Sequence, residues 1–184
     1  MTEEIIIAGF GGQGVLSMGQ ILCYSGVMQN KEVSWFPSYG PEMRGGTANC
    51  TAIISDDKIS SPVLNTFDTA IVLNQPSMDK FEDAIKPGGM LIYEVNGMTR
   101  KPKRDDINIC KIAAYDESIK MKNTKIFNMI VIGGFLKVKP ILEIKNVIKG
   151  LEKVLPERYH HLIPLNKEAI QRVIEIIEFE KKID

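Results

Sequence analysis

The sequence has few cysteines and histidines, and they are not spaced as metal ligands. Its three cysteines, Cys23, Cys50 and Cys110, are far apart, and no CxxC pair occurs. The two histidines, His160 and His161, are adjacent in a segment flanked by prolines. Because zinc and iron–sulfur sites need several closely placed cysteine or histidine ligands, we expect no metal centre within this chain. So few cysteines also fit a cytoplasmic protein.

An excess of charge of either sign is absent as well. The 184 residues include 23 Lys and Arg and 23 Asp and Glu, so the formal net charge is zero. Nucleic-acid-binding domains usually carry a basic face, and we therefore expect no nucleic acid as a partner. Zero net charge gives little protection against association. This favours a permanent protein partner and, for the isolated chain, a homodimer.

Long apolar runs are missing too. No window approaches the roughly 18 consecutive apolar residues of a membrane-spanning helix. The acidic start MTEE leads directly into IIIAGF, which does not resemble a secretory signal peptide. The apolar content of 44% is ordinary for a globular protein of this length. We expect one domain over residues 1–184, no membrane segment and a cytoplasmic location.

Short apolar runs alternate with segments of helical period along most of the chain. Strands are expected at residues 4–8, 33–36, 47–54, 69–73, 90–94 and 107–112. Helices are expected at residues 13–29, 125–138, 141–154 and 166–182, the last with Asn166 as its N-cap. A further helix is expected to begin after Ser77, which would be its N-cap. This order predicts a three-layer, Rossmann-like α/β fold with a mainly parallel sheet, helices on both faces and C-terminal helices.

A glycine loop follows the first expected strand and precedes the first expected helix. Gly9, Gly11 and Gly14 give the pattern G-x-G-x-x-G, in which backbone N–H groups and the helix dipole favour an anion. The dinucleotide form also needs an acid at the end of the second strand, and the residues Trp35 to Ser38 contain none. The glycines serve either an anionic or polar ligand or close strand–helix packing, and the pattern alone leaves both open.

The segment WFPSYGPEMRGGTANC, residues 35–50, contains a second glycine-rich loop with one arginine. Arg44 suits a bidentate contact with a phosphate or carboxylate, or it pairs with Glu42 or with a neighbouring subunit. Ligands of α/β sheets bind at the carboxyl ends of the strands, where both loops and Asn74 are expected. The candidate ligand-binding residues are therefore Gly9, Gly11, Gly12, Gln13, Gly14, Ser38, Tyr39, Arg44, Gly45, Gly46, Thr47 and Asn74.

No catalytic residue is expected. Cys50 lies in a strand pattern and is best explained as a small buried apolar residue, and no base–nucleophile pair or carboxylate pair is evident. The basic run of residues 101–104, KPKR, is expected to be a solvated loop, with binding of an acidic partner as the alternative. A glycine-loop domain without its own chemistry suggests a component that completes a site in a larger assembly.

The motifs together resemble the gamma subunit of 2-oxoacid:ferredoxin (acceptor) oxidoreductases. The resemblance is carried by AGFGGQGV, SYGPEMRGGTANC, LNQPS (73–77), KPGG (86–89) and Asn128 followed by Gly133 and Gly134. It covers residues 4 to about 180. Members of this family oxidatively decarboxylate a 2-oxoacid, pass electrons to ferredoxin or another acceptor and form an acyl-CoA.

The resemblance implies a division of labour between subunits. Alpha, beta and ferredoxin-like delta subunits would be the partners, and they would hold thiamine diphosphate, magnesium and 4Fe-4S clusters. No cofactor is expected to bind this chain tightly, and coenzyme A is the expected contact. 2-Oxoglutarate is our first choice of substrate, with pyruvate, branched-chain 2-oxoacids and indolepyruvate left open. The alternative from another class is a stand-alone nucleotide- or NAD-binding protein.

Overall fold

A computed structural model of the protein describes residues 1–38, 46–173 and 176–183. The strands and α-helices are, in chain order, β1 (Thr2–Phe10), α1 (Val15–Met28), β2 (Glu32–Ser38), β3 (Thr47–Ser55), β4 (Phe67–Val72), α2 (Gln75–Phe81), β5 (Ile85–Glu94), β6 (Asn108–Ile112), α3 (Ala114–Lys120), α4 (Phe127–Val138), α5 (Ile144–Val154), α6 (Ile163–Arg172) and β7 (Ile177–Lys181). Short 3-10 helices are η1 (Glu82–Ala84), η2 (Val95–Gly97), η3 (Thr124–Ile126) and η4 (Glu157–Leu162).

Within the described residues, the strands form one sheet in the order β2-β3-β1-β4-β5-β6-β7. Strands β1, β4, β5 and β6 are parallel, which confirms the predicted parallel centre. The edges differ, because β3 runs antiparallel to both β1 and β2, and β7 runs antiparallel to β6. Only residues 39–46 separate β2 from β3, whereas a parallel connection needs a crossover of about a dozen residues or more.

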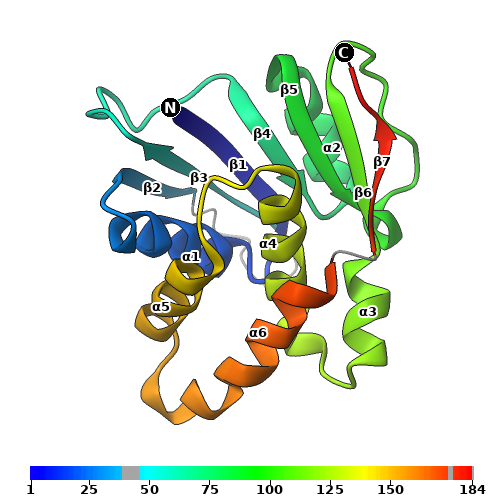
Figure 1. Ribbon diagram of the computed structural model, residues 1–184. Coiled ribbons are helices and arrows are strands. Elements are labelled where there is room, and N and C mark those ends of the chain that lie inside the picture. Colours follow the sequence, from blue (N-terminus) through cyan, green and yellow to red (C-terminus); the bar gives the residue numbers. More distant parts are fainter. Residues whose placement is uncertain (39–45, 174–175, 184) are drawn as a thin grey trace.

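Helices cover both faces of the sheet, as predicted. Figure 1 shows α1, α4, α5 and α6 in front of the sheet and α2 behind it. The front layer encloses the larger apolar cluster, and α2 packs its buried Met78 into a smaller cluster behind β4 and β5. Residues Ile5–Ala8 of β1 lie between the two clusters and are at most 1% exposed. An uninterrupted apolar run is what a strand buried on both faces requires.

Helix α1 approaches its neighbours closely at small residues. A Cβ atom at Gly26 would lie 2.6 Å from Val33 Cγ1 in the sheet. On another side of the helix, a Cβ at Gly150 of α5 would lie 2.5 Å from Ser25 Oγ. The small pair Ser25-Gly26 therefore serves two contacts, one with the sheet and one with α5.

The C-terminal helix expected at 166–182 is wrong in both its start and its end. Helix α6 begins at Ile163, so Asn166 lies inside it and donates its amide to the Leu162 carbonyl at 2.8 Å instead of capping. The chain then returns to the sheet as β7, where Ile177 pairs with Ile112. The alternation of charged and apolar residues in IEFEK fits this edge strand. Helix α3 was not expected at all.

The basic run at 101–104 is more firmly held than a solvated loop. The carboxylate of Glu82, whose side chain is 3% exposed, accepts hydrogen bonds from the backbone N–H of Lys103 and, at 3.1 Å, of Arg104. It also pairs with the Arg100 guanidinium at 2.8 Å, and Arg100 in turn binds Asp79 at 2.7 Å. Glu82 thus fixes the connection between β5 and β6.

Candidate functional site

The glycine loop lies at the carboxyl end of β1. Gly12 and Gly14 have φ angles of 98° and 76°, the left-handed region that glycine adopts without strain. The loop is closed by the Gln13 side chain, whose Oε1 accepts the Phe10 N–H at 2.6 Å. Gly14 is the N-cap residue of α1 and offers no side chain there. The first N–H groups of α1 therefore face outward beside an uncovered backbone.

The two predicted loops meet at this edge of the sheet. The Gly11 N–H donates to the Gly46 carbonyl at 3.0 Å, which joins the glycine loop to the segment before β3. Ser38 and Thr47, the end residues of β2 and β3, are exposed at the same edge. Tyr39, Arg44 and Gly45 lie outside the described residues, so the ligand or pairing role of Arg44 stays a prediction.

Two of the other candidates, Gly9 and Asn74, make structural contacts. Gly9 lies inside β1, where a Cβ atom would come within 2.6 Å of Gln13 Oε1 and 3.0 Å of Leu73 Cβ, so this glycine allows packing. Asn74 is 1% exposed and caps α2 by accepting the Ser77 N–H at 2.9 Å. The expected cap at Ser77 is therefore wrong, because the Asn74 side chain reaches the N–H three residues later, as N-caps do.

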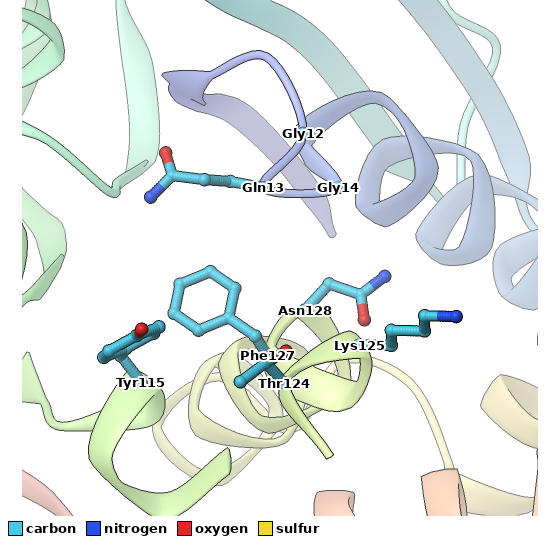
Figure 2. A pocket seen from close by; sticks show the side chains of 8 residues that line it. All are labelled: Gly12, Gln13, Gly14, Tyr115, Thr124, Lys125, Phe127 and Asn128. Atoms are coloured by element: carbon cyan, nitrogen blue, oxygen red, sulfur yellow. The ribbon is translucent and has the colours of Figure 1, made fainter. Parts of the chain in front are cut away.

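A cavity of about 290 Å³ separates the glycine loop from the start of α4. Figure 2 shows the loop on one side and the first residues of α4 on the other, with the Gln13 side chain and the Lys125 side chain extending in opposite directions. The residues that line it are Gly12, Gln13, Gly14, Tyr115, Thr124, Lys125, Phe127 and Asn128. Of the predicted residues, three consecutive ones, Gly12 to Gly14, line this cavity.

The electrostatics of this cavity favour an anion. The N-termini of α1 and α4 both border it, and neither helix has an acidic residue in its first turn. Each N-terminus carries the equivalent of about half a positive charge, and Lys125 adds a full one. None of the described residues that line the cavity is Asp, Glu, His or Cys. The arrangement can bind an anionic group.

Asn128 connects this cavity to a second one. Its Cβ would lie 3.1 Å from a Cβ placed on Gly14, and no partner for its buried Oδ1 is found among the described residues. On the other side, Lys125 and Asn128 also line a groove of about 350 Å³ between α1, α4, α5 and α6. The groove is mainly aliphatic, with Leu151 and Met129 in its wall. An anionic head and an extended apolar tail could therefore occupy adjoining spaces.

The cysteines do not contribute to the site. Burial raises the pKa of Cys50 to about 12, and burial likewise raises the pKa of Cys23 and of Cys110 to about 12. A thiol with such a pKa is not a thiolate near neutral pH and reacts slowly. The Cys50 thiol donates to the Val15 carbonyl at 3.4 Å. It is a packing residue beneath the first turn of α1, in agreement with the sequence interpretation.

Sequence reasoning missed the side of the cavity that faces the glycine loop. Tyr115, Thr124, Lys125 and Phe127 come from α3, η3 and α4, more than 100 residues after the loop, and no motif marks them. Asn128 was noted only as part of the family resemblance. Among all the helices that the structure describes, none has both the length and the hydropathy that a membrane crossing requires.

Known proteins share this sequence pattern. The family model for pyruvate ferredoxin/flavodoxin oxidoreductase matches residues 4–176. The ketoisovalerate oxidoreductase subunit VorA of Methanothermobacter thermautotrophicus is 49% identical over 91 residues, which make up 50% of this chain but only 19% of that protein. The 2-oxoglutarate synthase subunit KorC of Methanocaldococcus jannaschii is 31% identical over 160 residues, covering 85% of this chain and 86% of that protein.

Solved structures share the fold. A keto/oxoacid ferredoxin oxidoreductase gamma subunit from Geobacter sulfurreducens superposes with a TM-score of 0.81 and 21% identity, over 97% of this chain and 99% of that one. A chain of the 2-oxoglutarate:ferredoxin oxidoreductase from Magnetococcus marinus, solved with 2-oxoglutarate, coenzyme A and succinyl-CoA bound, gives a TM-score of 0.84 at 22% identity. That match covers 94% of this chain and 30% of the other.

Proposed function

The chain belongs to the pyruvate ferredoxin/flavodoxin oxidoreductase family, and on this basis we propose that it is the gamma subunit of a multi-subunit 2-oxoacid:ferredoxin oxidoreductase. The observation that carries the proposal is the KorC alignment, which covers 85% of this chain and 86% of that subunit. The proposed partners are alpha, beta and ferredoxin-like delta subunits.

For the substrate we propose 2-oxoglutarate, which the complex would convert with coenzyme A to succinyl-CoA. The support is the name of the relative that aligns over most of both chains. The branched-chain 2-oxoacid ketoisovalerate is the second candidate, because the VorA relative has the higher identity, 49%, over its 91 aligned residues. The relative rates with 2-oxoglutarate, ketoisovalerate and pyruvate decide between the candidates.

The role proposed for this chain is to hold the anionic part of coenzyme A. Its diphosphate suits the cavity where the N-termini of α1 and α4 face each other, and Lys125 provides a charge-assisted contact there. Gly12 and Gly14 leave the backbone uncovered beside the phosphates. Asn128 offers an amide at the boundary with the aliphatic groove.

The redox and decarboxylation chemistry is proposed to reside in the partner subunits. The described residues contain no group of three His, Cys, Asp or Glu side chains that could hold a metal ion, and the three cysteines are buried. These residues do not fit an iron–sulfur cluster. Thiamine diphosphate, magnesium and the clusters would be supplied by other chains, while this chain binds and positions the acyl acceptor.

The proposal is tested by anaerobic affinity purification of the tagged chain from the cells that carry its gene. We expect it to co-purify with larger subunits that contain thiamine diphosphate and iron. The complex should reduce a viologen dye with 2-oxoglutarate and coenzyme A faster than with pyruvate or ketoisovalerate, and the chain alone should be inactive. Purification of the chain without such partners, together with saturable NAD binding, would instead support the stand-alone nucleotide-binding protein.

A further inference from the structure

The outer side of helix α1 carries no charge although it is exposed. Residues 5–30 contain no Asp, Glu, Lys, Arg or His, whereas charged residues make up 25% of the whole chain. Two large apolar side chains of α1, Tyr24 and Val27, are nonetheless 45% and 48% exposed. Helix α5, which packs against α1, instead has exposed lysines such as Lys149 and Lys153. An exposed apolar surface that is depleted of charge is typical of a protein interface.

The uncharged side of α1 continues into the edge of the sheet. Within the described residues β2 is an end strand that pairs with β3 alone, and Figure 1 shows it beside α1. The two elements touch at Cys23, whose thiol donates to the Ser34 carbonyl at 3.3 Å. Val27 lies one turn after Cys23 on the same side of α1, and Phe36 of β2 is 51% exposed. We call the surface formed by Gln20, Tyr24 and Val27 together with strand β2 the α1–β2 face.

Strand β2 offers backbone groups for a further strand. The outer N–H and C=O groups of an end strand are a template for a strand from another chain. Pro37 has no N–H to donate, so the pairing is expected over residues 32–36. A twofold axis at Ser34 would bring two β2 strands together antiparallel. Glu32 would then lie opposite Phe36 of the second copy rather than opposite its own counterpart, so no like charges would meet across the pair.

We propose that the α1–β2 face binds the same face of a second copy of this chain. Two β2 strands then join the two sheets into one, and two α1 helices pack against each other beside the joint. The uncharged surface decides the occupant, because a face that meets its own copy in a symmetric dimer places like groups close together. A charged face would repel itself, whereas this one does not. The inference is independent of the proposed function.

The size of the α1–β2 face suits a reversible dimer. Strand β2 has seven residues and α1 has 14, so the two are about 23 and 21 Å long at roughly 3.3 and 1.5 Å per residue. One helix beside one sheet layer is about 20 Å across, and two such faces together cover roughly 900 Å². This area is at the low end for specific interfaces, so we expect association at micromolar concentration rather than a permanent dimer.

The first test is sedimentation of the full chain from low to high micromolar concentration. The mass of the unmodified chain should rise from 20.6 kDa toward twice that value. Val27→Lys should raise the dissociation constant at least about 10-fold, because each copy would bury an unpaired charge. Ile119→Lys is the matched control, because Ile119 is similarly exposed, at 52%, in the last turn of α3, and it should leave the constant unchanged.

The second test locates the twofold axis by a disulfide. Residues directly opposite in an antiparallel pair have Cα atoms about 4.5–5.5 Å apart, which a disulfide can span. Ser34→Cys should therefore form a covalent dimer under mild oxidation, whereas the native cysteines are buried. The two copies of Glu32 would be four residues apart along the strands, about 13 Å, so Glu32→Cys should form no such dimer.

Three results would overturn the inference. The first is a chain that stays monomeric at every concentration, and the second is a dissociation constant that Val27→Lys raises no more than Ile119→Lys does. The third is a covalent dimer that forms as readily in Glu32→Cys as in Ser34→Cys. If the unmodified chain is monomeric and Val27→Lys prevents co-purification of larger subunits, the α1–β2 face belongs to a different partner and the self-association is refuted.

Discussion

Replacement of Glu82 by alanine should destabilise the fold more than any other single change to a charged residue at the β5–β6 connection. Its carboxylate is almost completely buried, accepts two backbone N–H groups and pairs with Arg100 at 2.8 Å. Breaking a buried pair by removing one partner costs about 3–5 kcal/mol. Arg100 remains 25% exposed and keeps its contact with Asp79, so the lower end, about 3 kcal/mol, is expected.

This free energy translates into a readily measured shift of the melting temperature. For a chain of this size, each kcal/mol lowers Tm by about 2–4 °C, so Glu82→Ala should lower it by about 6–12 °C. Glu82→Gln keeps one acceptor oxygen and should lose roughly half as much. Asp79→Ala is the matched control, because Asp79 contacts the same arginine but is 55% exposed, and exposed pairs contribute little.

The assay is thermal and urea unfolding followed by circular dichroism, with hydrogen exchange of residues 98–106 as a local readout. Exchange in this segment should accelerate in Glu82→Ala, because the N–H groups of Lys103 and Arg104 lose their acceptor. A Tm loss in Glu82→Ala no larger than that in Asp79→Ala would refute the reasoning, since it would mean that the buried carboxylate is not what holds the connection.

Further predictions concern the site and the cysteines. Lys125→Ala should raise the KM of the assembled enzyme for coenzyme A about 10- to 150-fold, which is the effect of one lost charge-assisted contact. Lys137→Ala, at the other end of α4, is the control and should leave this KM unchanged. Gly14→Ala should weaken the same binding and lower Tm, because φ is 76° and the new Cβ would lie 3.1 Å from Asn128 Cβ; normal coenzyme A kinetics would contradict this. The free energy of unfolding should fall above about pH 8.5, where the thiols of the unfolded chain ionise, because the folded chain keeps Cys50 protonated up to about pH 12. The expected loss is about 1.4 kcal/mol per pH unit for each buried thiol. Urea unfolding at pH 8 and pH 10 measures this loss, and a midpoint that does not change with pH would contradict it. The isolated chain should form a homodimer, which light scattering checks, and a monomer at micromolar concentration would count against it.

The central strands and the glycine loop could be predicted because their signals are local. The apolar run Ile5–Ala8 is typical of a strand with apolar neighbours on both faces. Gly12 and Gly14 of the loop after it adopt positive φ angles, which favour glycine. The edge strand β7 could not be recognised in the same way. Its five residues are contiguous with a helical pattern, and only pairing of Ile177 with Ile112, distant in the sequence, selects the strand.

The candidate site was half predictable for the same physical reason. A glycine loop at a strand's carboxyl end fixes one wall, because backbone N–H groups at a helix N-terminus favour an anion whatever the side chains are. The opposite wall is made of ordinary residue types, and their value depends only on where α4 begins. Lys125 is one of many lysines in this sequence, and its proposed role follows from its position in η3, beside the N-terminus of α4 and in the same cavity lining as Gly14. The same holds for Tyr115, which a helical pattern would assign to any exposed surface. Sequence patterns can therefore locate groups that act through the backbone. Side chains that lie about 100 residues from the loop in the sequence can be identified only from the fold, which brings their helices next to the loop.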